Sequence, residues 1–199
     1  MKLAARDFPN VLPQDGEAFF IKQFYNREQA DLLATRLLEG LAWQEETLFI
    51  FGRRVKAPRL MCWYGDPGAA YRYSGVDHPP LPWNSVLEEL KAAVEAVCGQ
   101  DFNSVLANLY RNGRDSMGCH ADNEPELGFR PVIASLSFGA GRRFKFHHKN
   151  QRLTVNLVLE HGDLLVMQGD TQHQWLHSVP KSQCELPPRI NLTFRKIMI

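Results

Sequence analysis

The sequence predicts a mainly β protein of the α+β class, in which two helices support an antiparallel sandwich or barrel. From Phe102 onward, short runs of β-branched and aromatic residues alternate with turn residues, and little helical pattern lies between them. Before that point the chain has two amphipathic helical segments. Many short strands at this spacing favour an antiparallel architecture, and a jelly roll is one natural solution.

The two helices are expected over residues 26–40 and 84–99. Each segment begins at an asparagine, which is a favoured N-cap, and ends at a glycine. Up to Gln23 we expect irregular structure, because Pro9 and Pro13 interrupt any period. The apolar residues that recur at helical spacing are Leu32, Leu33, Leu37 and Leu38 in the first segment and Val86, Leu87, Leu90, Val94 and Val97 in the second.

Six strands are expected in the second half of the chain, separated by turn residues such as Asn112-Gly113 and His161-Gly162. They cover residues 104–111, 131–138, 143–148, 153–160, 163–167 and 189–196. With 199 residues the chain has the usual size of one domain and can bury a core without disulfides. We therefore expect a single domain over residues 1–199.

The overall charge is nearly balanced, at +1, so it does not draw the protein toward polyanions. A nucleic-acid substrate would have to be met by local patches. On charge alone, the two basic clusters are interpreted as solvated strand faces. They are Arg53, Arg54, Lys56 and Arg59, and further on Arg142, Arg143, Lys145, His147, His148 and Lys149.

The four cysteines are widely spaced and form no CxxC pair, which argues against a zinc knuckle or a thioredoxin-type motif. The first residues lack the apolar core of a signal peptide, and no apolar run approaches membrane-spanning length. We expect a soluble protein in the reduced cytoplasm, or in the nucleus if the source is eukaryotic, with no membrane partner.

Polar residues alternate with apolar ones along the last expected strand. The period of two puts Arg189, Asn191, Thr193 and Arg195 on one face. If both faces are covered, the polar one lines a ligand cavity, because buried guanidinium groups require an anionic partner. Two arginines at this spacing suit a small dicarboxylate held bidentately at each end. The alternative is an exposed strand face.

His120 and Asp122 are also two residues apart, which on an extended segment directs both side chains toward one ion. A second histidine would complete a two-His-one-carboxylate triad with open coordination positions. The pair alone is weak evidence, because chance produces one in about a third of such chains. The candidates for the distal histidine are His147, His148, His161, His173 and His177. We favour His177, which lies in a short β-like run just before the arginine strand.

Together these motifs resemble the AlkB family of Fe(II)/2-oxoglutarate-dependent nucleic-acid dealkylating dioxygenases, and most closely its duplex-acting members. The most specific match is the Arg-x-Asn-x-Thr-Phe-Arg run of residues 189–195. Further matches are Asn108-Leu-Tyr110, the run IASLSFG at 133–139 and the run PRLMCWYG at 58–65, so that the resemblance covers about residues 45–196.

The resemblance implies a double-stranded β-helix that uses Fe(II), 2-oxoglutarate and O2. It implies iron ligation by His120, Asp122 and His177, which are also the catalytic residues. For 2-oxoglutarate it implies binding by Asn108, Tyr110, Arg189, Asn191 and Arg195. The chain would then divide into a jelly-roll catalytic core over 101–199 and an N-terminal extension with a nucleotide-recognition region over 1–100.

The implied reaction is oxidative demethylation of 1-methyladenine or 3-methylcytosine in DNA, a direct-reversal repair, by a monomeric enzyme. The base must leave the stack to reach the iron. Tyr73, the better match of the Tyr71–Tyr73 pair, would stack on it, and Glu124 would face its charged edge. Phe51 would fill the gap in the duplex, with Arg53 and Arg54 beside it on phosphates. Packed aromatics and a solvated carboxylate are the ordinary alternatives.

Two other functions remain open at this stage. One is an oxygenase of the same scaffold that acts on RNA, a protein side chain, a lipid or a small metabolite. The other is a jelly-roll binding module without enzymatic activity, in which His120 and Asp122 are structural or hold a redox-inert metal.

Overall fold

The computed structural model describes the backbone of residues 3–50, 53–69, 71–73 and 76–198. It also describes the side chains of these residues, with the exception of residues 48–50, 53, 71–73 and 76–78. In chain order the helical elements are η1 (Ala5–Asp7), α1 (Arg27–Gly40), α2 (Ser85–Cys98), η2 (Pro125–Leu127) and α3 (Thr171–Gln174). The strands are β1 (Glu17–Ile21), β2 (Gln44–Ile50), β3 (Arg53–Gly65), β4 (Tyr71–Tyr73), β5 (Val76–His78), β6 (Ser104–Tyr110), β7 (Met117–His120), β8 (Ile133–Gly139), β9 (Arg142–His148), β10 (Thr154–Leu159), β11 (Leu164–Gln168), β12 (Trp175–Val179) and β13 (Arg189–Arg195).

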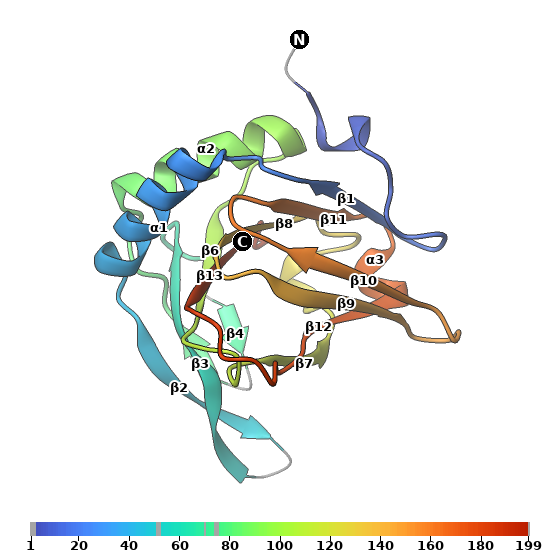
Figure 1. The fold of residues 1–199 in the computed structure, drawn as a ribbon. Coiled ribbons are helices and arrows are strands. Elements are labelled where there is room, and N and C mark those ends of the chain that lie inside the picture. Colours follow the sequence, from blue (N-terminus) through green and yellow to red (C-terminus); the bar gives the residue numbers. More distant parts are fainter. Residues whose placement is uncertain (1–2, 51–52, 70, 74–75, 199) are drawn as a thin grey trace.

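Two antiparallel sheets form the body of the protein (Figure 1). The larger has seven strands in the order β1-β11-β8-β13-β6-β3-β2, and the smaller has four in the order β10-β9-β12-β7. A separate two-stranded sheet joins β4 and β5. The predicted antiparallel, mainly β architecture is therefore confirmed, with the strands arranged as a jelly roll.

The larger sheet is covered on both faces. Apolar residues on its two faces belong to two different hydrophobic clusters. Ala134, Leu136 and Phe138 of β8 pack in the cluster that includes α1 and α2. Ile133 of the same strand packs in the second cluster, with residues of the smaller sheet such as Phe146. In Figure 1, α1 and α2 lie on one side of the larger sheet and the smaller sheet lies on the other. Side chains between the two sheets are therefore enclosed.

The two long helices follow the sequence expectation within one residue at each end. Asn26 accepts a hydrogen bond from the Gln29 N–H at 2.9 Å, and Asn84 accepts one from the Leu87 N–H at 3.0 Å. The apolar face of α2 is buried as expected. In α1, Leu33 and Leu37 are buried, but Leu32 and Leu38 are 63% and 47% exposed, so the expected stripe was too wide.

The expectation of irregular structure up to Gln23 was wrong. Residues 17–21 form β1, an edge strand that pairs antiparallel with β11, Glu17 opposite Gln168. Its partner lies far away in the sequence, so local patterning gave little signal. In the described part of the chain, no helix is both long and apolar enough to cross a membrane.

Candidate metal and co-substrate site

Three side chains with metal-binding atoms meet at two neighbouring strands of the smaller sheet and the loop that follows one of them. His120 ends β7, Asp122 follows two residues later, and His177 lies in β12 directly opposite His120. One ligand atom from each residue lies within 4.8 Å of those of the other two. Their convergence is therefore a result of strand pairing, and the donor set of two imidazoles and one carboxylate suits Fe(II) with open positions.

Both histidine rings are oriented by their neighbours. His120 Nδ1 lies 3.0 Å from the Gly118 carbonyl oxygen, which can only accept, so Nδ1 carries the proton and Nε2 is left to coordinate. His177 stacks on Phe144, with ring centroids 5.4 Å apart and planes inclined by 16°. The two histidine rings are 4.3 Å apart.

Asp122 is buried and held from two sides. Arg195 Nη2 donates to its Oδ2 at 2.9 Å, and its backbone N–H donates to Gln172 Oε1 at 2.9 Å. Oδ1 lies 3.8 Å from His120 Nε2. The carboxylate therefore has one oxygen tied to a cation and the other turned toward the histidines.

Burial and charge set the protonation of the triad. Burial raises the pKa of Asp122, but Arg195 and the two histidines outweigh it and hold that pKa at about 2. Burial, reinforced by His120, lowers the pKa of His177 to about 3 against the attraction of Asp122. At neutral pH the carboxylate is ionised and His177 is neutral, which are the forms that bind a metal ion.

The polar face of β13 lies between the two sheets, as its alternation predicted. Arg189, Asn191, Thr193 and Arg195 are between 2% and 8% exposed, whereas the opposite face packs against the helices. Asn191 donates from Nδ2 to Ser135 Oγ at 2.9 Å, and Thr193 donates to Asn191 Oδ1 at 3.2 Å. The alternative of an exposed strand face does not hold.

Arg189 retains donors for an anion. Its Nη2 donates to Ser137 Oγ at 2.9 Å, while Nε and Nη1 are buried and have no hydrogen-bond partner among the described residues. Its guanidinium lies 5.1 Å from the ring centroid of Tyr110, the residue opposite it in β6. A buried cation with unused donors fits the free carboxylate of a dicarboxylic acid.

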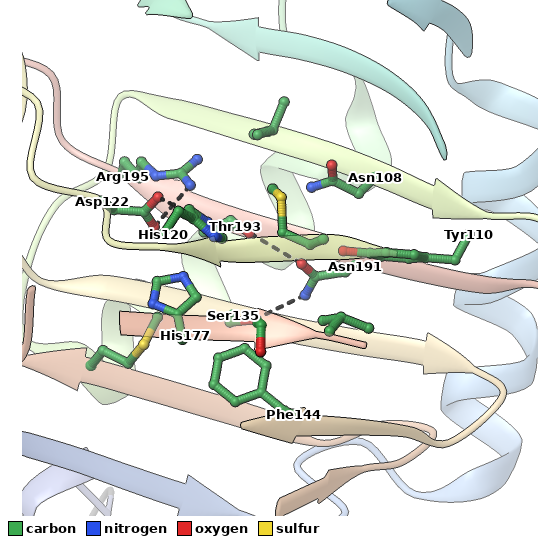
Figure 2. Close-up of a pocket in the computed structure, with 15 residues that line it drawn as sticks. Asn108, Tyr110, His120, Asp122, Ser135, Phe144, His177, Asn191, Thr193 and Arg195 are labelled. Carbon is green, nitrogen blue, oxygen red and sulfur yellow. Dashed lines mark hydrogen bonds and ion pairs between the residues drawn. The ribbon is translucent and has the colours of Figure 1, made fainter. Parts of the chain in front are cut away.

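One cavity connects these groups. It is lined by Leu106, Asn108, Tyr110, Met117, His120, Asp122, Ser135, Phe144, Met167, His177, Ser178, Val179, Asn191, Thr193 and Arg195. Figure 2 shows His120, Asp122 and Arg195 gathered at one end and Tyr110 at the other, with Asn191 between. A ligand that chelates a metal at one end would thus direct its other end toward Tyr110 and the neighbouring Arg189.

Two buried arginines beside this cavity were missed, because both were assigned to solvated strand faces. Arg59 of β3 is 1% exposed and donates from Nε to Asn108 Oδ1 at 2.7 Å. Arg142 of β9 is 3% exposed, and its guanidinium lies 5.5 Å from the Tyr110 ring centroid. Their partners come from other strands, so charge and spacing gave no signal.

Arg142 also joins the ends of the two metal-ligand strands. Its Nη2 donates to the carbonyl oxygens of Asp115 at 2.7 Å and of Pro180 at 2.9 Å. Asp115 precedes β7 and Pro180 follows β12. The shared cation therefore fixes how the two strands that carry His120 and His177 lie relative to each other.

The expected substrate residues are only partly described. Glu124 is half-buried two residues after Asp122, where it precedes η2, but it does not line the cavity. Arg54 is exposed on β3. Phe51 lies outside the described residues, as do the side chains of Arg53 and Tyr73, whose backbones belong to β3 and β4.

Comparison with known proteins agrees with this geometry. The model of the 2OG-Fe(II) oxygenase superfamily matches residues 17–195. The chain belongs to this family. Fe(II), 2-oxoglutarate and O2 are the family's metal and co-substrates, and they fit the donor set, Arg195 in the cavity and Arg189 beside Tyr110.

Several known proteins resemble the chain over most of its length. Human alkB homolog 3, an alpha-ketoglutarate-dependent dioxygenase, is 42% identical over 184 residues, which cover 87% of this chain and 64% of that protein. The human DNA oxidative demethylase ALKBH2 is 45% identical over 158 residues, which cover 75% of this chain and 60% of that protein. The matched region is thus less than two thirds of either human relative. The DNA oxidative demethylase ALKBH2 of Arabidopsis thaliana is 33% identical over 219 residues, which cover 94% of this chain and 68% of that protein.

A solved structure supports the fold alone. The structure of OsALKBH1 superposes with a TM-score of 0.63 at 22% identity, covering 90% of this chain and 97% of that one. The fold of this chain is therefore shared with that structure at low sequence identity.

Proposed function

We propose that this chain is an Fe(II)- and 2-oxoglutarate-dependent oxygenase that oxidatively demethylates N-alkylated bases, of the 1-methyladenine and 3-methylcytosine type, in DNA. The observation that carries the oxygenase part is a cavity with the metal triad at one end and Tyr110, whose ring lies 5.1 Å from the Arg189 guanidinium, at the other. The choice of DNA is supported by the 45% identity to relatives named DNA oxidative demethylases.

In this proposal the metal ion is held by His120 Nε2, Asp122 Oδ1 and His177. Arg189 binds the distal carboxylate of 2-oxoglutarate with Nε and Nη1, which have no hydrogen-bond partner in the described part of the chain. Arg195, fixed on Asp122 Oδ2, contributes positive charge near the metal-bound end.

The remaining co-substrate residues line the cavity between the two ends. Asn108 and Tyr110 come from β6, and Asn191 lies opposite Asn108 on β13. Asn108 is itself held by Arg59, and Asn191 by Ser135. We propose that these fixed amides and the Tyr110 hydroxyl orient 2-oxoglutarate by hydrogen bonds.

When bound, the iron and its co-substrates supply the oxidising power for hydroxylating the N-methyl group. Overall, 2-oxoglutarate, O2 and the methylated base give succinate, CO2, formaldehyde and the repaired base. The chain's own contribution is to orient the co-substrate and the methyl group and to exclude water from the enclosed space between the sheets.

For the base we propose stacking by Tyr73 and contact of Glu124 with the positively charged edge. Phe51 would enter the gap in the duplex, with Arg53 and Arg54 on the phosphates. The hairpin of β2 and β3 extends beyond the body of the protein in Figure 1, and Arg53 and Arg54 are the first two residues of β3. Such a projection suits contact with a nucleic acid.

The test is formaldehyde and succinate formation from 1-methyladenine oligonucleotides with iron(II), ascorbate and 2-oxoglutarate. Single- and double-stranded DNA and the matching RNA are compared, with Asp122→Ala as the control. Both products from DNA support the proposal, and preference for RNA would move it to the alternative substrate. Succinate without formaldehyde would reject these substrates, and neither product from folded, iron-loaded protein would reject the enzyme.

The organisation of the protein is also proposed. We propose a monomer that acts in the cytoplasm, or in the nucleus of a eukaryote, with residues 1–100 serving nucleotide recognition and 101–199 catalysis. Strands β1, β2 and β3 from the first part lie in the same sheet as the catalytic strands, so the two parts share one core. Light scattering of the protein with and without DNA tests the monomer.

A further inference from the structure

A fully buried amide lies behind the metal triad. Gln172 is 0% exposed and belongs to α3, the four-residue helix between β11 and β12. A buried amide has to find hydrogen-bond partners. Its Oε1 accepts from the backbone N–H of Asp122 at 2.9 Å, while its Nε2 has, among the described residues, only the weak acceptor Met167 Sδ, at 3.6 Å. The strong contact of this side chain is therefore the one to Asp122.

Asp122 lies in a segment that has no regular secondary structure to fix it. Residues 121–124 follow β7 and precede η2, and they belong to neither. The side chain is held at Oδ2 by Arg195. The backbone of the same residue is held by Gln172. Two independent contacts thus set both the position of the Asp122 backbone and the direction in which its Oδ1 points.

The position of α3 is itself fixed by contacts from two other parts of the chain. The Glu17 N–H donates to Thr171 Oγ1 at 2.8 Å, and Lys149 Nζ donates to the Gln172 carbonyl oxygen at 3.0 Å. β12, with His177, begins directly after α3. Gln172 therefore connects the strand that supplies one metal ligand with the loop that supplies another.

We propose that Gln172 is a positioning residue for the metal centre, which fixes Asp122 relative to His177 through the Asp122 backbone N–H. This inference rests on the proposed metal site and deepens it. Removing the acceptor leaves a buried N–H unsatisfied and releases the loop, so Oδ1 is no longer held at the distance that coordination requires. The expected effect is weaker metal binding, of the 10- to 100-fold size that is typical of groups behind metal ligands.

The experiment compares Gln172→Met with the wild-type protein. Methionine keeps the length of the side chain but removes the acceptor. The dissociation constant of Mn(II) is measured on metal-free protein from the EPR signal of the free ion. The Co(II)-substituted protein is compared by its visible absorption, which reports ligand geometry. We expect at least about 10-fold weaker Mn(II) binding and an altered Co(II) spectrum for Gln172→Met.

Two further variants separate positioning from general loss of stability. Gln174→Met changes a partly exposed glutamine of the same helix and should bind Mn(II) as the wild type does. Gln172→Glu keeps an oxygen acceptor at the same place and should remain within about threefold of the wild type, well inside the range for lost contacts. If Gln172→Met does not fold, Gln172→Asn, whose acceptor is withdrawn by one methylene, replaces it.

A wild-type Mn(II) affinity and Co(II) spectrum in Gln172→Met, even with a lower Tm, would overturn the proposal and leave Gln172 a structural role. Equal losses in Gln172→Met and Gln174→Met would also overturn it, as would Mn(II) binding that survives Asp122→Ala. No nucleic acid is present in these measurements. Failure to demethylate DNA would therefore refute the proposed function without touching this inference.

Discussion

Replacing Arg189 by methionine should separate co-substrate binding from stability. The guanidinium is 2% exposed, and its Nε and Nη1 lack hydrogen-bond partners among the described residues. Each hydrogen bond to a charged partner contributes about 1.5–3 kcal/mol, so two of them with the distal carboxylate give about 3 kcal/mol or more. That loss corresponds to at least about 100-fold weaker binding of 2-oxoglutarate.

In Arg189→Met, the stability of the ligand-free protein should increase or stay the same, although co-substrate binding is weakened. Burial lowers the pKa of Arg189, and Arg142 lowers it further, against the opposing effect of Tyr110, so the charged form is disfavoured before the anion binds. Removing such a charge is often neutral or stabilising. We therefore expect the Tm of metal-free Arg189→Met to equal or exceed that of the wild type.

The assay measures the dissociation constants of two ligands, 2-oxoglutarate and 2-oxovalerate, for the Mn(II)-loaded wild type and for Arg189→Met. 2-Oxovalerate has the same chain and keto-acid group as 2-oxoglutarate but lacks the distal carboxylate. The wild type should prefer 2-oxoglutarate by about 100-fold or more, and Arg189→Met should bind both about equally. Arg143→Met, an exposed neighbour on β9, is the matched control. A preference that survives in Arg189→Met, or a Tm lowered by more than about 4 °C, would refute the reasoning.

Four further predictions follow from the same contacts. Asp122→Ala should abolish turnover and Mn(II) binding while the protein stays folded by circular dichroism, and full activity would remove Asp122 from the site. Phe51→Ala should lose activity on duplex DNA but keep it on single strands in the formaldehyde assay, and equal losses would count against a wedge. Burial lowers the pKa of His177 to about 3, so below about pH 6.5 the unfolded chain gains a proton that the folded chain does not. The Tm of the metal-free protein should therefore fall as the pH is lowered from about 6.5 toward 3, and it should fall less steeply in His177→Gln. Arg142→Lys should lower the free energy of unfolding in urea by about 2 kcal/mol or more, because one ammonium cannot reach carbonyls on two loops, and an unchanged midpoint would contradict this.

Local periodicity was enough to predict the parts of the fold with strong patterns. The helix at 26–40 was found because an asparagine cap, an apolar repeat and a closing glycine agree with one another. The alternation of polar and apolar residues from Arg189 to Arg195 predicted that the polar face of this strand lines a cavity if both faces are covered. Both faces of the strand are buried in the structure. β1 was missed because its pairing with β11 is a tertiary contact with little trace in the local sequence.

The candidate site shows the same limit. The spacing of His120 and Asp122 indicated a shared direction, but the choice of His177 over His173 depended on which segment is extended. His177 lies in β12 and opposite His120, whereas His173 belongs to α3. The positions of Gln172, Arg59 and Arg142 depend on contacts between segments far apart in the sequence, and no spacing rule contains that information.

The order of strands in the larger sheet has a consequence for how the protein acquires its structure. β13 is central in that sheet, between β8 and β6, yet it is the last of the described strands in chain order. During synthesis β8 and β6 emerge long before the strand that joins them, and each waits with unpaired backbone groups. Non-local pairings of this kind make folding slow. The site cannot form until Arg189 and Arg195 are in place, so the cavity is completed only after most of the sheet that encloses it has been synthesised.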